Sequence, residues 1–148
     1  METIQQHMTQ EHRDCDNLYA HLEEAIMDND LNSIKEYTEK FSNDLYAHLK
    51  REEEVLFPAF EEVSGSQMGP TQVMRMEHTQ IREMVAKIVQ LGGSDLTKES
   101  RNKLTGLLET LMILMQQHNM KEEQILYPMT DMALAGNFEE ILSAMKKI

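Results

Sequence analysis

Two segments of the chain carry histidine and glutamate at the same spacing. His48 is followed four positions later by Glu52, and His118 is followed four positions later by Glu122. Both segments continue with a second glutamate and end in leucine, an aromatic residue and proline. On a helix, residues i and i+4 lie about one turn apart on the same face. An imidazole nitrogen beside a carboxylate that can bridge suits a pair of first-row metal ions, so the spacing predicts metal binding.

Two further histidines extend the repeat beyond these motifs. The segment from Met8 to His12 parallels the segment from Met74 to His78, with a glutamate directly before each histidine. The chain therefore consists of two similar halves, each predicted to be a helical hairpin with the order His…His-x3-Glu. Folded face to face, the hairpins would offer four imidazoles and two bridging carboxylates to two metals. Each six-coordinate ion would keep two free places, one for a shared oxo or hydroxo bridge and one for a small ligand.

The order of the motif separates it from ferritin-like di-iron bundles, which use Glu-x-x-His. The chain instead resembles hemerythrin-like (HHE cation-binding) domains over about residues 5–130. The resemblance implies a four-helix bundle around a non-haem di-iron centre that meets O2, NO or peroxide. The residues that match the family's metal ligands are His12, His48, Glu52, His78, His118 and Glu122. No catalytic residue and no organic cofactor are expected.

Two positions depart from the oxygen-carrying hemerythrins. Those proteins have a further histidine one turn before the third-helix ligand, where this chain has Met74, and an aspartate five residues after the last histidine, where it has Glu122 at four. The set of four histidines and two glutamates is more similar to bacterial proteins that repair damaged iron–sulfur centres and to stress-related hemerythrin-like proteins. We therefore expect binding, sensing or reduction of a small ligand rather than reversible O2 carriage.

Three alternatives stay open at this point. The first is an iron-donor or repair protein with an iron–sulfur protein as its client. The second is an enzyme, such as a peroxidase or an NO reductase, although the sequence favours a binding protein. The third is a purely structural metal site, for example for zinc.

Several polar residues flank the predicted ligands. The glutamates beside them are expected to lie behind the ligands or on the helix surface, and they are Glu11, Glu53, Glu77 and Glu123. By helical periodicity His7 and His21 lie off the ligand face, and His21 is expected to be exposed. Asp16 lies one turn after His12, where the other half has Arg82. Asp16 could pair with Arg82 across the bundle, orient an imidazole, or relay protons near the open site.

The apolar residues near the site have simpler interpretations. Met8 and Met74 each lie one turn before a predicted ligand, where they form either an apolar lid over the metals or ordinary core. Tyr19 is expected to pack in the core. Cys15 is expected to be an unreactive thiol.

The elements that must position these residues are helices. Apolar periodicity predicts helices over residues 2–29, 31–63, 70–91 and 97–128, and a short amphipathic tail over 138–147. Asp30 and Thr97 are expected to cap helices. Pro58 is expected to end or kink regular hydrogen bonding, and the fourth helix to end near Pro128. The predicted fold is all-α: an antiparallel up-down four-helix bundle of two repeated hairpins, with a short C-terminal helix across one end.

Composition limits the class of protein. The chain has 148 residues, 41% of them hydrophobic and 27% charged, which suits a single domain over residues 1–148. Its net charge of −12 disfavours nucleic acid and anionic membranes as partners. One cysteine allows no disulfide within the chain and fits a reducing compartment. No signal peptide or membrane span is expected, so a cytoplasmic location is predicted.

Overall fold

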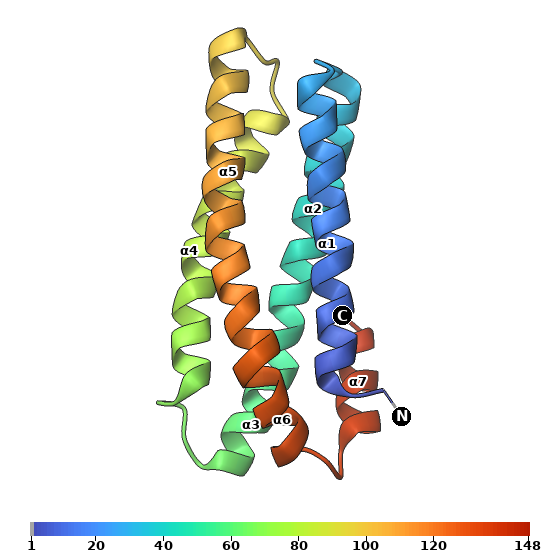
Figure 1. Ribbon diagram of the computed structural model, residues 1–148, viewed down its shortest axis with the longest axis vertical. Helices are drawn as coiled ribbons and strands as arrows, with labels where there is room; N and C mark the ends of the chain where they lie inside the picture. Colours follow the sequence, from blue (N-terminus) through green and yellow to red (C-terminus); the bar gives the residue numbers. More distant parts are fainter. Residues whose placement is uncertain (1) are drawn as a thin grey trace.

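Four long helices form the body of the molecule (Figure 1). The structure is a computed structural model that describes residues 2–148. The long helices are α1 (Ile4–Met27), α2 (Leu31–Arg51), α4 (Pro70–Gly92) and α5 (Lys98–Lys121). Each runs antiparallel to the next, and the four close into a bundle because α5 also packs on α1. The predicted all-α bundle is confirmed.

The helix starts follow the capping rules that the sequence suggested. The Asp30 side chain accepts a hydrogen bond from the Ser33 N–H at the start of α2. Thr97 and Ser100 form a reciprocal capping box at the start of α5. Both predicted caps are therefore confirmed, and each satisfies a backbone N–H that the helix leaves without a partner.

Both motif helices pass through a π-helical turn and then continue. The helix α2 leads through η1 (Glu52–Leu56) into α3 (Phe57–Ser64), and α5 leads through η2 (Glu122–Leu126) into α6 (Tyr127–Ala133). The expected interruption before Pro58 is thus present as a π turn. The expectation that the fourth helix ends near Pro128 is wrong. Proline is tolerated in the first turn of a helix, where it costs no intrahelical hydrogen bond.

The π turn leaves one backbone carbonyl in each half without its helical partner. In a π turn the N–H of residue i bonds to the carbonyl of residue i−5, and the residue five positions after Glu53 or Glu123 is proline. A neighbouring helix supplies the missing donor in both halves. Arg75 Nη1 donates to the Glu53 carbonyl at 3.4 Å, and Gln5 Nε2 donates to the Glu123 carbonyl at 2.8 Å.

Two apolar clusters fill the bundle. The upper core lies between the four long helices and includes Tyr19, Phe41, Ile81 and Leu111. The lower core joins the helix ends near η1 and η2 to α7 (Phe138–Lys146), and it includes Ile4, Met8, Leu56, Phe57, Met74, Leu126, Tyr127 and Met145. His12 on α1 and His78 on α4 fall between these two clusters along their helices. Among residues 2–148 no helix is both long enough and apolar enough to cross a bilayer.

Candidate metal centre

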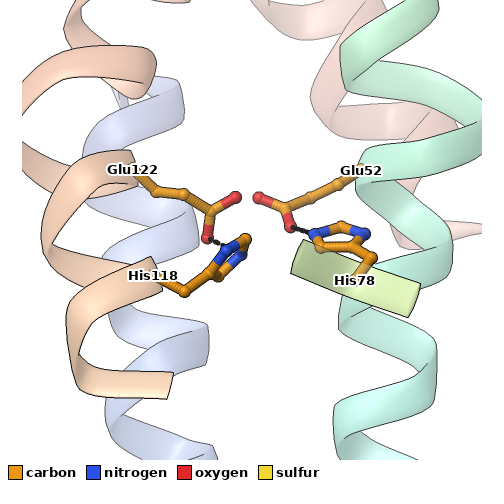
Figure 2. A group of neighbouring side chains, drawn as sticks. All are labelled: Glu52, His78, His118 and Glu122. Carbon is orange, nitrogen blue, oxygen red and sulfur yellow. Dashed lines mark ion pairs between the residues drawn. The ribbon is translucent and has the colours of Figure 1, made fainter. Parts of the chain in front are cut away.

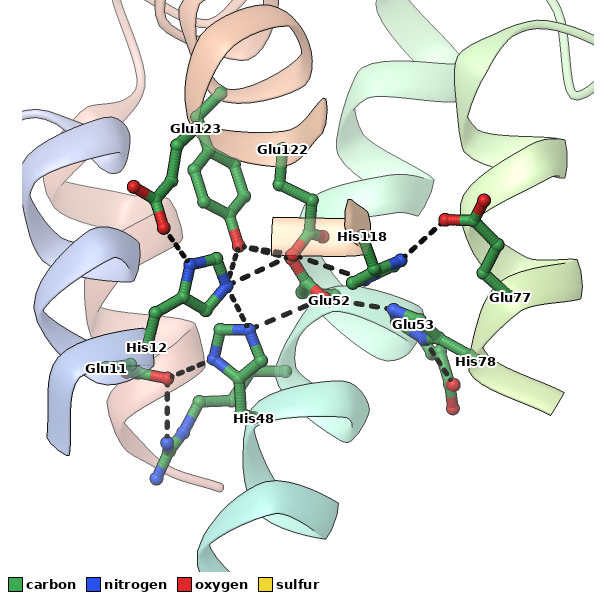
Figure 3. Close-up of polar contacts among 12 residues, drawn as sticks. Glu11, His12, His48, Glu52, Glu53, Glu77, His78, His118, Glu122 and Glu123 are labelled. Atoms are coloured by element: carbon green, nitrogen blue, oxygen red, sulfur yellow. Dashed lines mark hydrogen bonds and ion pairs between the residues drawn. The ribbon is translucent and has the colours of Figure 1, made fainter. Parts of the chain in front are cut away.

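Six buried side chains meet between the two cores. They come from both hairpins, and Figure 3 shows their imidazoles and carboxylates turned toward one another. These inner residues are His12, His48, Glu52, His78, His118 and Glu122. They are the same six that the sequence analysis singled out. Their relative exposure is 4% or less in every case, so charged and polar atoms are withdrawn from water here.

The inner residues form two groups that share one carboxylate. The first group, drawn in Figure 2, consists of Glu52, His78, His118 and Glu122. The second consists of His12, His48 and Glu122. Within each group one potential ligand atom per residue lies within 4.8 Å of all the others. This spacing could hold a metal ion in each group.

Each inner carboxylate reaches an imidazole of both groups. Glu122 Oε1 lies 3.1 Å from His12 Nε2 and 3.3 Å from His118 Nε2. The corresponding distances from Glu52 Oε1 are 3.1 Å to His78 Nε2 and 3.6 Å to His48 Nε2. Both carboxylates therefore lie where a group that bridges two metals would lie.

The π turns set the positions of these two carboxylates along their helices. Glu52 and Glu122 are the first residues of η1 and η2, directly after the α-helical turn that carries the histidine of each motif. A π turn adds a residue to the helical turn and often marks a functional site. Neither π turn was predicted, although the proline six positions after each glutamate was the available signal.

The outer nitrogen of every inner histidine bonds to a glutamate of another helix. The Nδ1–glutamate distances are 2.7 Å for His12–Glu123, 2.9 Å for His48–Glu11, 2.7 Å for His78–Glu53 and 2.8 Å for His118–Glu77. We call these four carboxylates the outer glutamates. Because Nδ1 donates outward, Nε2 faces the centre and is the nitrogen available to a metal. These glutamates lie behind the inner histidines, as expected.

Three of the outer glutamates also contact cations. Glu11 pairs with Arg51 at 3.1 Å, and the His7 imidazole lies 2.9 Å from its carboxylate. The other two contacts are Arg82 to Glu53 at 2.9 Å and Lys121 to Glu77 at 2.6 Å. Partial burial opposes ionisation, but hydrogen bonds from the histidine and the cation hold the pKa of both Glu11 and Glu53 at about 2.

Glu123 differs from the other three. Within residues 2–148 its side chain forms an ion pair only with His12. The position equivalent to Arg82 in this half is Asp16, which is exposed and forms no ion pair with any residue the structure describes. The predicted Asp16–Arg82 pair is therefore not formed, because Arg82 turns to Glu53. Glu123, not Asp16, orients the His12 imidazole.

The charges of the inner residues are strongly coupled. Burial and the neighbouring Glu122 raise the pKa of Glu52. Burial also opposes ionisation of Glu122, yet the charge of His118 and hydrogen bonds from its neighbours hold the pKa of Glu122 well below its usual value. Although burial disfavours their charge, contacts with the inner and outer carboxylates raise the pKa of His12 and of His78 to about 9.

The inner atoms also show whether a metal fits. Four of them are buried and make no hydrogen bond to any described residue: Glu52 Oε1, His78 Nε2, His118 Nε2 and Glu122 Oε2. Buried polar atoms normally have partners, since leaving one without a partner costs about 1–3 kcal/mol. A metal ion would satisfy all four. Nitrogen and carboxylate donors in this number suit iron, manganese or zinc, so the residues fit the predicted metal centre.

A seventh side chain enters the centre from α6. The Tyr127 hydroxyl lies 2.6 Å from Glu52 Oε2, 3.0 Å from Glu122 Oε1 and 3.1 Å from His12 Nε2. Burial and the two carboxylate charges raise the pKa of Tyr127 well above its usual value, so the phenol stays protonated and donates to Glu52. Tyr127 was not among the predicted site residues. The available signal was the aromatic position of the motif, which is Tyr127 in one half and Phe57 in the other.

The remaining predicted residues lie outside the centre. His21 is exposed and stacks on Tyr37, as expected of a residue off the ligand face. Tyr19 lies in the upper core, where its hydroxyl donates to the Leu108 carbonyl at 2.8 Å. Cys15 is buried, and burial raises the pKa of its thiol, in agreement with an unreactive role. Met8 and Met74 belong to the lower core beneath the centre.

A helical bundle with histidines and carboxylates meeting at its centre defines a class of metal-binding bundle proteins. Within that class, the sequence profile of the Hemerythrin HHE cation binding domain matches residues 3–130. The chain therefore belongs to the hemerythrin HHE cation-binding family. The match spans all six inner residues, and it confirms the resemblance inferred from the motifs.

Curated relatives extend the comparison. The chain is 29% identical over 113 residues to the iron–sulfur cluster repair protein YtfE of Enterobacter sp. (strain 638), and 30% identical over 113 residues to YtfE of Escherichia coli O81 (strain ED1a). Each alignment covers 70% of this chain and 48% of the relative. The chain thus spans about half the length of these relatives. No solved structure gave a significant match.

Proposed function

We propose that the chain binds two iron ions at the candidate metal centre and uses them to bind, sense or reduce a small ligand. One ion would be held by the second group, His12, His48 and Glu122, and the other by the first group, Glu52, His78, His118 and Glu122. The single observation that carries the proposal is the pair of buried ligand groups that meet at Glu122. Iron, rather than another first-row metal, is supported by membership of the hemerythrin family.

The iron pair, when bound, supplies redox chemistry and free coordination places for O2, NO or peroxide. The residues of this chain would do the rest. The outer glutamates fix the imidazoles so that Nε2 faces inward, and the two inner carboxylates reach both groups. The upper and lower cores enclose the centre, so bulk water is excluded and only small molecules would reach it.

The test is an absorption spectrum of the protein in air, before and after azide is added. Charge-transfer bands that shift with azide, together with two irons per chain, support an open di-iron site. Zinc in place of iron, or iron whose spectrum ignores azide and NO, would contradict the proposal and favour a structural metal site. Multiple turnovers of H2O2 or NO per iron pair, rather than stoichiometric binding, would show an enzyme.

A second function is supported equally well by the comparisons. The curated relatives are iron–sulfur cluster repair proteins, so the chain could donate iron to a damaged iron–sulfur protein. Incubating the iron-loaded protein with an apo iron–sulfur acceptor under reducing conditions separates the two functions. Reconstitution of the acceptor's cluster spectrum supports repair, whereas full retention of iron by this chain supports ligand binding alone.

A further inference from the structure

One face of the second half of the bundle is apolar although it is open to solvent. The continuous helix formed by α5, η2 and α6 carries a row of apolar side chains that are each between 39% and 84% exposed. We call this row the outer stripe, and its members are Ile113, Met120, Ile125, Met129 and Met132. Exposed apolar surface of this extent usually marks a site of interaction with another molecule.

The π turn keeps the members of the outer stripe in line. Ile113 and Met120 are seven residues apart, which is about two turns of an α-helix. The next member, Ile125, follows after five residues rather than four, and η2 adds one residue to this turn. Met129 and Met132 then follow at the i+4 and i+7 positions of α6. The stripe therefore runs along one side of the helix for roughly 30 Å.

The outer stripe lies on a face without exposed acids. Of the nine exposed side chains between residues 113 and 132, only Lys121 is charged, and it pairs with Glu77 of α4 at 2.6 Å. Apart from the inner residue Glu122, the acids of this segment are Glu123 and Asp131, which are half-buried and bond to α1. The remaining exposed side chains are glutamines, at Gln116, Gln117 and Gln124.

The equivalent face of the first half is charged and partly covered. Exposed charged residues, Lys50, Glu54 and Glu62, take the places of Met120, Gln124 and Met132. The helix α7 packs on η1 and lines a groove together with Val55 and Ala59, whose counterparts belong to the outer stripe. In the second half no such helix among residues 2–148 covers the stripe, since all of its members are exposed.

We propose that the outer stripe is the interface of a homodimer, in which the stripes of two copies of this chain pack against each other about a twofold axis. Two chains with a net charge of −12 each repel one another, so they approach closely only through faces without acids. A basic partner would instead be drawn to faces that carry acids, such as the one with Glu54 and Glu62. The occupant that suits an uncharged stripe on an acidic chain is therefore a second copy.

The side chains of the stripe suit contact with themselves. A twofold interface places the same surface on both partners. Methionine side chains adapt their shape to one another, and glutamine amides both donate and accept hydrogen bonds. Nine exposed side chains are fewer than the roughly 20–30 residues that each partner contributes to a standard stable interface. The dimer should therefore be weak and reversible, with a dissociation constant of roughly micromolar size.

Sedimentation velocity of the purified protein tests the inference. The wild-type protein is expected to pass from monomer to dimer as its concentration rises through the micromolar range, also after treatment with a chelator. High salt should favour the dimer, because salt screens the repulsion between two acidic chains. Met120→Glu and Met132→Glu each place a charge in the stripe, so each should raise the dissociation constant by roughly tenfold or more.

Met27→Glu is the matched control. Met27 is 86% exposed at the end of α1, outside the stripe, and the substitution adds the same charge. Its dissociation constant should stay close to that of the wild-type protein. A circular dichroism melt shows whether each variant is folded, and Met132→Glu keeps the test decisive if Met120→Glu unfolds.

Four results would overturn the inference. The first is a protein that stays monomeric at every concentration. The second is a dimer that is lost when metal is removed or salt is raised, since metal or ion pairs would then hold it together. The third is a dimer that Met27→Glu weakens as much as the two stripe variants do. The fourth is a series of species larger than a dimer, which a closed twofold interface does not form.

Discussion

The two hairpins contain the same inner residues but surround them differently. The first hairpin holds Glu52 and the second holds Glu122 at the start of a π turn, and each helix pair adds two histidines in matching places. Around this shared arrangement the two halves differ at equivalent positions. Phe57 in the first half corresponds to Tyr127 in the second, and Asp16 in the first corresponds to Arg82 in the second. The repeated residues therefore form the candidate metal centre, whereas the differing residues give its two sides different surroundings.

The largest expected effect comes from the histidines that the halves share. His48→Ala and His118→Ala each remove one inward nitrogen, so each should lose at least one metal ion per chain. His21→Ala is the matched control, since it removes an exposed histidine of the same bundle. Metal analysis of the three purified variants measures the effect. Equal metal content in all three variants would contradict the assignment of His48 and His118 as metal ligands.

The outer glutamates allow a sharper comparison between the halves. Glu123→Gln and Glu53→Gln should each lower metal affinity by roughly 10–100-fold, as loss of a histidine's carboxylate partner does. Glu53→Gln should also destabilise the fold more, because Arg82 loses its partner while Glu123 has no Lys or Arg partner among residues 2–148. Competition with a metal chelator and a thermal melt measure the two effects. Identical melting temperatures for Glu53→Gln and Glu123→Gln would contradict the expected difference in stability.

Stability should depend on pH in the same way in both halves of the metal-free protein. His12 and His78 have pKa values of about 9 in the metal-free protein, above the usual 6.5. Their contribution to stability is complete below pH 6.5 and is lost as pH rises through about 9. The metal-free protein should therefore melt at a lower temperature at pH 9.5 than at pH 6.5.

Bound metal should weaken that dependence. Metal ligation requires neutral imidazoles, so binding displaces their protons and metal affinity should rise with pH up to about 9. Thermal melts of chelator-treated and metal-loaded protein at both pH values provide the comparison. A metal-free protein whose melting temperature is the same at both pH values would contradict it.

A smaller effect is expected where neighbouring helices satisfy the π-turn carbonyls. Gln5→Ala and Arg75→Ala each remove a donor to the carbonyl that proline leaves without a helical partner. Gln5→Ala should lower the free energy of unfolding by about 1 kcal/mol, the typical value of one such bond. Arg75→Ala should lower it by more, because Arg75 also pairs with the Glu61 carboxylate at 3.1 Å. Urea denaturation measures it. Gln10→Ala is the control on α1, since among residues 2–148 its side chain bonds only to Asp14, which is on the same helix.

The smallest effect should come from making the halves more alike at the surface. Asp16→Arg would give Glu123 the cation that Glu53 already has in Arg82. An exposed pair of this kind contributes about 0–1 kcal/mol, so the melting temperature should rise slightly in low salt and return toward the wild-type value in high salt. A lower melting temperature in low salt would show that Asp16 has a role the contacts do not reveal.

Much of this arrangement could be predicted from sequence, because it repeats. The i, i+4 spacing of histidine and glutamate and the matching Glu11-His12 and Glu77-His78 segments were enough to identify all six inner residues. Helical periodicity located the bundle and its caps. What repetition could not reveal was how each helix adapts around its motif. A one-residue π turn leaves the apolar pattern on either side intact, so the proline six positions after each glutamate was the available signal for it.

The contacts that depend on packing between helices were also beyond the sequence. Arg82 was expected to face Asp16, but its guanidinium reaches Glu53 on a neighbouring helix instead. Tyr127 was treated as a flanking residue of the motif because tyrosine and phenylalanine are equivalent in an apolar pattern. Only its place among Glu52, Glu122 and His12 shows that its hydroxyl belongs to the centre.

The most direct test is the metal content per chain of the protein purified without added metal, measured by inductively coupled plasma mass spectrometry. The central claim is that the buried inner residues form one site for a pair of iron ions. The wild-type protein should contain about two irons per chain. A single ion per chain, or a chain that binds no metal while the bundle stays folded, would contradict it.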